Sequence, residues 1–396
     1  MGGSLVSDVP EETAESDDST TVRNDRCELF ELSGEMLQYH NEIMAAAEVP
    51  VNRTIRNTIA KLNRNNVREL TAPKFVNGAT GNRLVLGVAS MREHMTDEGW
   101  QITHGLSLNG YKHCGYLLDE NKTDVNELIS KHNPETVVIQ DVREWDYQSG
   151  DFRDKNAMFT NVDSMRARDD IFRLTILKDS HQRPGYHSDN CRMMGIHAWI
   201  VYYNEQIVKH LATYVRPQHL IRTTHSIDKN IVPAFSEQRD SGCLFSGAVS
   251  RAYPLRQSII HHRHRLPIFV QPHPGYHRDG CVVPSFMSLL NKFKVSICTS
   301  SMYGYTLRKL IESTACGCRV ITDLPWDEIL PVVEENLIRI NPTDNHRTIK
   351  RTINDAIGSY SYDKQRELAK RAIEHYDYRV VCAKLAEDIQ TMKDNY

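Results

Sequence analysis

Short apolar runs alternate along this chain with segments in which hydrophobic residues recur at helical spacing. The apolar runs are bounded by polar turns, as buried strands of parallel sheets are. They cover residues 83–90, 116–118, 136–140, 172–178 and 198–202, and then 242–248, 266–275, 294–299, 320–323 and 337–340. Helical spacing covers 103–111, 125–132, 205–213, 348–357 and 364–392. This alternation predicts an α/β protein with parallel strands and right-handed crossovers.

The length of the chain indicates more than one domain. Its 396 residues exceed what a single hydrophobic core usually fills. A stretch rich in proline, serine and charged residues at 233–240 suits a solvated hinge. We therefore predict a first domain over 80–235, a second over 241–360 and a closing helical segment over 361–396.

The N-terminal residues differ in composition from the rest. Residues 1–25 are rich in Ser, Thr, Asp and Glu and contain no base before Arg23, which predicts a disordered acidic tail. Residues 26–75 carry apolar residues at helical spacing with basic residues between them, which predicts a helical extension. Its basic face either is solvated beside the first domain or meets a polyanionic acceptor or another subunit.

Bulk composition narrows the class of protein. The hydrophobic content of 40% and charged content of 25% are typical of a globular protein, and the net charge of −3 argues against a whole-chain nucleic-acid or anionic-membrane binder. No stretch approaches the roughly 18 apolar residues of a membrane span, and no signal-peptide pattern opens the chain, so we expect a cytoplasmic protein. The nine cysteines match no zinc or disulfide spacing, so we expect reduced thiols and no metal site.

The most informative stretch covers residues 294–323. It predicts a short strand, a polar loop containing glycine, a helix that ends at Gly317, and a second strand. In such units a ligand lies beyond the carboxyl end of the strand, where the first helical turn offers unpaired N–H groups. Lys309 and Glu312 lie three residues apart and share one helix face. We interpret them as groups that hold a diphosphate and the hydroxyls of a ribose.

The pattern from Lys309 and Glu312 to Ala315-Cys316-Gly317, followed by the strand at 320–323, resembles the donor segment of GT-B glycosyltransferases, which have two facing Rossmann-like domains. It is most similar to the group 1 transferases and to the spore-maturation-protein-like glycosyltransferase family. The resemblance implies that Glu312 holds the nucleotide ribose and that the terminal helix crosses back onto the first domain. Group 1 enzymes usually carry an acid where this chain has Gly304, which leaves a retaining or inverting outcome open.

The resemblance also implies a donor site. The turn at Gly247, with Arg251 and Arg256 after it, stands where those families place the donor phosphate loop, and a bare backbone turn with guanidinium groups suits a diphosphate. The alternative is two surface arginines after an ordinary turn. No Asp-x-Asp occurs in the donor half, so we expect cations rather than a metal to neutralise the diphosphate of a UDP- or GDP-type sugar, with no further cofactor. The remaining candidate donor contacts are His273, Gly304, Tyr305, Thr306 and Lys309.

In the first domain, Asp179 and His181 follow a predicted strand at the edge that faces the crevice, which makes them the acid–base candidates. The predicted function is metal-independent transfer of a sugar, as by a hexosyltransferase, from a nucleoside-diphosphate sugar to an acceptor hydroxyl. A non-catalytic nucleotide-sugar or glycan-binding protein and a nucleotide-sugar epimerase stay open as alternatives. The acceptor is a glycan, a small molecule or modified DNA. Basic residues at 53–68 and 261–265 permit DNA, as in the viral DNA glycosyltransferases of this architecture.

Overall fold

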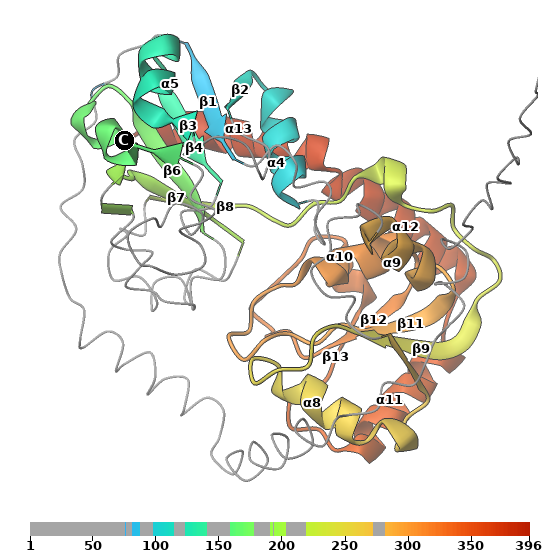
Figure 1. Cartoon of the computed structure of the whole chain (residues 1–396). Coiled ribbons are helices and arrows are strands. Elements are labelled where there is room, and N and C mark those ends of the chain that lie inside the picture. The colour runs from blue at the N-terminus through green and yellow to red at the C-terminus, as the bar shows by residue number, and fades with distance from the viewer. Residues whose placement is uncertain are drawn as a thin grey trace, which may run out of the picture.

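The computed structural model describes residues 76, 81–87, 98–114, 123–140, 159–177, 191–192, 194–202, 219–271 and 282–396 (Figure 1). Four predicted segments lie outside these residues and stay predictions. They are the acidic tail (1–25), the helical extension (26–75), the strand at 116–118 and the helix at 205–213.

The first sheet has six strands, all parallel, in the order β2-β1-β4-β6-β7-β8. Its central strands are buried along their whole length, as parallel strands covered on both faces are. The strands are β1 (Arg83–Leu86), β2 (Tyr111–Cys114), β4 (Thr136–Ile139), β6 (Phe172–Leu177), β7 (Ala198–Val201) and β8 (Leu220–Arg222). A separate parallel pair joins β3 (Thr123–Asp124) to β5 (Phe159–Thr160).

The second sheet has five parallel strands in the order β10-β9-β11-β12-β13. Its strands are β9 (Asp240–Ser246), β10 (Ile268–Gln271), β11 (Phe293–Ile297), β12 (Arg319–Thr322) and β13 (Leu337–Arg339). Two parallel sheets with helices confirm the predicted α/β class, and Figure 1 shows the sheets in two separate lobes.

Two helices accompany the first sheet, α4 (Glu98–Ser107) and α5 (Val125–His132), together with the 3₁₀ turn η4 (Val162–Ala167). The bounds of α5 agree with the prediction, because Asp124 caps its first turn and Asn133 ends it in the left-handed conformation. The prediction of a helix over 103–111 was wrong in its bounds, because α4 starts at Glu98 and ends at Ser107. The chain leaves α4 through a turn in which Gly110 has φ +86°, a value that ends a helix, and Tyr111 already belongs to β2.

Alternate residues of the second sheet face two helical layers. Cys243 and Phe245 of β9 pack against α8 (Pro254–His261) and α11 (His346–Gly358), whereas Leu244 faces the opposite layer. That layer consists of α9 (Val282–Leu290), α10 (Arg308–Ala315) and α12 (Tyr362–Tyr376). Short 3₁₀ turns complete this half of the chain, η6 (Lys229–Ile231), η7 (Arg263–Arg265) and η8 (Val333–Asn336).

The single helix predicted over 364–392 is wrong, because the chain breaks it at Asp377 into α12 and α13 (Tyr378–Asp394). The Asp377 carboxylate caps α13 by accepting from the N–H of Arg379. At the break, Ile227 donates its N–H to Tyr376 O and accepts from the N–H of Tyr378, each at 2.9 Å. These two hydrogen bonds tie the segment around Ile227, which leads into the second half, to the junction between α12 and α13.

Helix α13 lies against the first half of the chain. Leu385, Ala386 and Ile389 belong to the same core as the first sheet, and α13 packs on α4 with Cys382 against Gly105. Near its end, Lys393 forms a buried ion pair with Glu135 at 3.0 Å. Within the described part of the chain, no helix is long and apolar enough to cross a membrane.

Candidate functional site

The carboxyl ends of β9, β11 and β12 meet at one edge of the second sheet because the strands are parallel. After β9 the chain turns at Gly247, whose φ of +120° lies in a region that favours glycine. After β11 a polar loop leads to α10, which starts without a capping side chain at Leu307. The edge therefore combines a bare turn with the positive end of a helix.

Three predicted donor residues converge at this edge. A methyl group on Gly247 would lie 2.6 Å from Arg256 Nη1 and 2.9 Å from Lys309 Nζ. Both contacts are closer than a side chain tolerates, so only glycine lets the two cations lie side by side against the turn. Lys309 Nζ donates to Ser246 Oγ at 3.3 Å and also lies over the ring of Phe286.

Arg256 is buried and Lys309 is half-buried. Burial lowers the pKa of Arg256. Burial, together with the charge of Arg256, lowers the pKa of Lys309 to about 8. Within the described part of the chain neither side chain forms an ion pair with a carboxylate. Two neighbouring cations, one buried and one half-buried, favour an anionic ligand.

Arg256 also holds the turn in place. Its guanidinium donates to Ala248 O at 2.7 Å and to Thr299 Oγ1 at 3.0 Å, and it lies 3.9 Å from the ring centre of Tyr253. A longer contact of 3.4 Å reaches Thr299 O. Because a guanidinium has five N–H donors, two are left over by these bonds. Arg256 thus joins the loops after β9 and β11 and keeps donors for a ligand.

Glu312 is buried on α10 and its closest cation is Arg308, not Lys309. Arg308 Nε lies 3.0 Å from Glu312 Oε1, in an i,i+4 pair whose two side chains are almost fully buried. The sequence-based prediction paired Glu312 with Lys309, three residues away. The four-residue spacing to Arg308 was an equally visible signal.

The loop before α10 reaches the first half of the chain. Gly304 has φ +68°. Tyr305 is buried in the core of the first sheet, with Tyr303 and Leu307 packed against the same core. The loop that carries three of the predicted donor contacts is therefore positioned by both halves of the molecule.

A chain of buried polar groups continues from Thr306 across the two halves. Thr306 Oγ1 donates to Glu328 Oε1 at 3.0 Å, and Glu328 also pairs with Arg222 at the end of β8. Thr306 O lies 3.3 Å from His225 Nε2, while His225 Nδ1 pairs with Glu98 at the start of α4. The two ring nitrogens of His225 thus join α4 of the first half to the loop before α10 of the second.

The other predicted site residues do not join this cluster. Arg251 is exposed on the turn after Gly247, whereas Arg256 is buried. His273, Asp179 and His181 lie outside the described residues, and their assignments stay predictions. Among the residues that the structure describes, no group of His, Cys, Asp and Glu could hold a metal ion.

Several residues of the site were not found from the sequence. Ser246 ends β9 and Thr299 lies two residues after β11, and short hydroxyl side chains at such positions are common. Asp323, at the end of β12, accepts from the N–H of Ser300, and burial raises the pKa of its carboxyl. Glu98 lies 127 positions from His225 in the sequence, so only the folded chain shows the pair.

Comparisons with known proteins agree with this architecture. No protein-family description and no curated protein matches the sequence. Among solved structures, sucrose-phosphate synthase from Thermosynechococcus elongatus superposes with a TM-score of 0.52 at 10% identity, over 80% of this chain and 100% of that one. An alpha-glucosyltransferase solved with UDP-glucose and DNA containing an abasic site gives a TM-score of 0.50 at 10% identity, over 78% of this chain and 99% of that one. At such identity the likeness shows the fold, the GT-B architecture of these transferases.

Proposed function

We propose that this protein is a glycosyltransferase that moves a sugar from a nucleoside-diphosphate sugar to an acceptor hydroxyl. The observation that carries the proposal is the pair of cations, buried Arg256 and half-buried Lys309, held side by side against the Gly247 turn. The fold supports it, because two transferases share the architecture and one was solved with UDP-glucose.

The chemistry that this pair favours is departure of a diphosphate. When the bond between sugar and diphosphate breaks, negative charge grows on the leaving oxygen. Cations fixed beside that oxygen stabilise the transition state more than the ground state. Arg256 and Lys309 supply the charge that a metal ion supplies in other transferases, so we propose a metal-independent reaction. The uncapped start of α10 adds partial positive charge at the same edge.

The ribose of the donor is assigned to Glu312. Its buried carboxyl group lies 3.0 Å from Arg308 Nε, which fixes its direction. An ionised carboxylate accepts hydrogen bonds from two neighbouring hydroxyls, which a ribose offers. On this proposal Asp179 or His181 takes the acceptor proton if the reaction inverts, and the leaving phosphate does so if it retains.

The test is titration of the protein with UDP and GDP, followed by product analysis with a panel of UDP and GDP sugars. Glu312→Ala should lose at least about tenfold in nucleotide affinity, since charged hydrogen bonds are worth roughly 1.5–3 kcal/mol. Glu335→Ala, an exposed acid of the same half, is the control. Nucleotide binding without product would indicate a binding protein. Product formed without acceptor would indicate an epimerase. Absence of binding at millimolar nucleotide would refute the donor site.

A further inference from the structure

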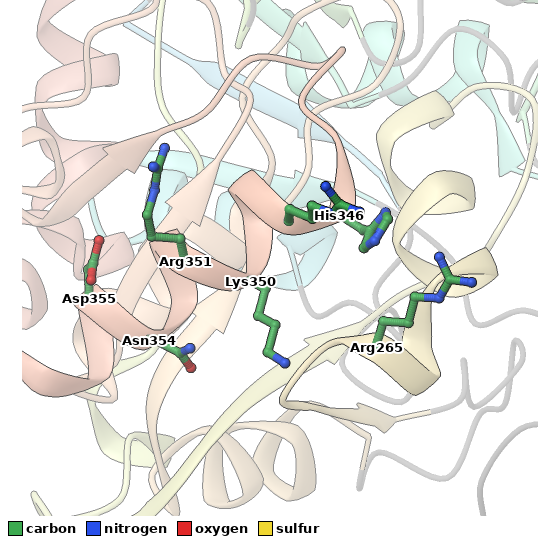
Figure 2. A pocket seen from close by; sticks show the side chains of 7 residues that line it. Arg265, His346, Lys350, Arg351, Asn354 and Asp355 are labelled. Atoms are coloured by element: carbon green, nitrogen blue, oxygen red, sulfur yellow. The ribbon is translucent and has the colours of Figure 1, made fainter.

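A second cluster of cations lies in the helical layer formed by α8 and α11. Here η7 and the first half of α11 border a hollow of about 410 Å³, within the size range of small-molecule sites. The hollow is lined by Arg265, His346, Arg347, Lys350, Arg351, Asn354 and Asp355 (Figure 2).

The helical period of α11 explains why these residues face outward together. Ile349, Ile353 and Ala356 form its buried face and pack under the second sheet. The lining residues of α11 occupy the remaining positions, where residues three or four apart are neighbours on the helix surface. In Figure 2, His346 and Lys350 lie on the side of α11 that faces Arg265, whereas Arg351 and Asp355 point away from Arg265.

The charges in the hollow are not balanced. Its lining contains four cations and one carboxylate. Within the described part of the chain none of the four forms an ion pair, although Arg339, Arg366 and Arg371 of the same half each pair with a glutamate. At the start of α11 the N–H groups of Arg347 and Thr348 donate to the capping side chain of Asn345, so the charge of the hollow comes mainly from side chains. Like charges three or four residues apart repel, and a bound anion would relieve that repulsion.

This hollow is separate from the donor edge. Arg256 lies in the first turn of α8, while η7 follows the other end of that helix. Eight helical residues span about 12 Å. An anion bound beside Arg265 and Lys350 is therefore not the diphosphate at Gly247.

We propose that the hollow binds a compact anion with two or more closely spaced phosphates, at a site distinct from the donor site. From His346 to Arg351 the helix rises only about 8 Å, which matches an oligophosphate better than the long track of a nucleic-acid backbone. Among the described residues that line the hollow there is no Phe, Tyr or Trp, the large aromatic side chains on which unpaired bases stack.

The experiment is calorimetric titration of the full chain with sodium tripolyphosphate at about 150 mM salt. The test variant is Arg265→Glu/Lys350→Glu, and the charge-matched control is Lys364→Glu/Lys370→Glu, which changes two exposed cations of α12. Lys309→Met removes a donor-site cation. All of the reversed charges are exposed, so thermal unfolding should show intact folding in each variant.

We expect the test pair to weaken tripolyphosphate binding at least about tenfold, as loss of charge-assisted bonds does. The control pair should bind as the wild type does. Lys309→Met, which removes a cation of the donor edge, should keep the binding event that the test pair loses, even where it removes a second event at the donor edge. Equal loss of tripolyphosphate binding in the test variant and in the control variant would show nonspecific attraction and overturn the proposal. Loss only in Lys309→Met would place the anion at the donor edge.

A duplex of about 30 base pairs is titrated in parallel. If the wild type binds the duplex but not tripolyphosphate, and the test pair binds neither, the surface is for nucleic acid and the compact-anion proposal falls. Since tripolyphosphate has no nucleoside, these outcomes are independent of the proposed transferase activity.

Discussion

The lowered pKa of Lys309 makes nucleotide affinity depend on pH in a specific direction. In the free protein this pKa is about 8, so the ammonium is mostly charged at pH 7 and mostly neutral at pH 9. A bound diphosphate favours the charged form and raises the pKa again. The protein must then take up a proton on binding above pH 8, and affinity falls as pH rises.

The magnitude follows from linkage. If the bound state keeps Lys309 charged throughout, the Kd for UDP rises about tenfold between pH 7 and pH 9 and about thirtyfold by pH 9.5. Below pH 7 the lysine is already protonated and contributes no slope. Calorimetric titration with UDP in buffers of different ionisation enthalpy measures both the affinity and the proton uptake.

Two variants separate this effect from other titrating groups. Lys309→Arg keeps a charge at every pH, so its UDP affinity should not change with pH over this range. The planar guanidinium changes the affinity itself. Lys309→Met should bind weakly at every pH. A wild-type profile that is flat from pH 7 to 9.5, or a slope that survives in Lys309→Met, would refute the reasoning.

Three further predictions follow from the same contacts. Gly247→Ala should lose at least about 100-fold in UDP affinity by calorimetry, because the methyl group displaces Arg256 and Lys309, whereas Gly110→Ala, also at positive φ but with open space around it, should leave affinity unchanged. Lys309→Met should stabilise the protein by on the order of 2 kcal/mol at pH 7 in urea unfolding, because the wild type buries a cation whose folded pKa lies below its unfolded value. This gain should shrink as pH rises above 8, where the wild-type lysine becomes neutral, and a pH-independent difference would contradict it. His225→Ala and Glu98→Ala should each destabilise the fold, and a double-mutant cycle should give a coupling of about 1–3 kcal/mol, whereas additive effects would show that the pair contributes nothing.

The pattern of apolar residues was sufficient for the fold class. Apolar runs such as 136–139 and 172–177 form strands because a parallel sheet that is covered by helices on both faces needs apolar side chains on both faces. Helix α5 was predicted with correct bounds because its capping residues are local signals. The break at Asp377 was not, since its extended backbone is selected by a hydrogen-bonded partner, Ile227, that is remote in the sequence.

The candidate site, like the fold, was predicted only in part from the sequence. The sequence alone indicated Gly247, Arg256 and Lys309 as donor contacts, because a glycine turn and cations after strands are local patterns that suit phosphate. Only the tertiary structure decided that Arg256 and Lys309 lie together against the glycine while Arg251 is exposed, and that Glu312 pairs with Arg308. It alone joined Glu98, His225, Thr306 and Glu328 across the two halves. The reason is physical: the period of a strand or helix determines which face a residue occupies, but burial, and with it the pKa of Lys309, depends on distant segments packed against that face.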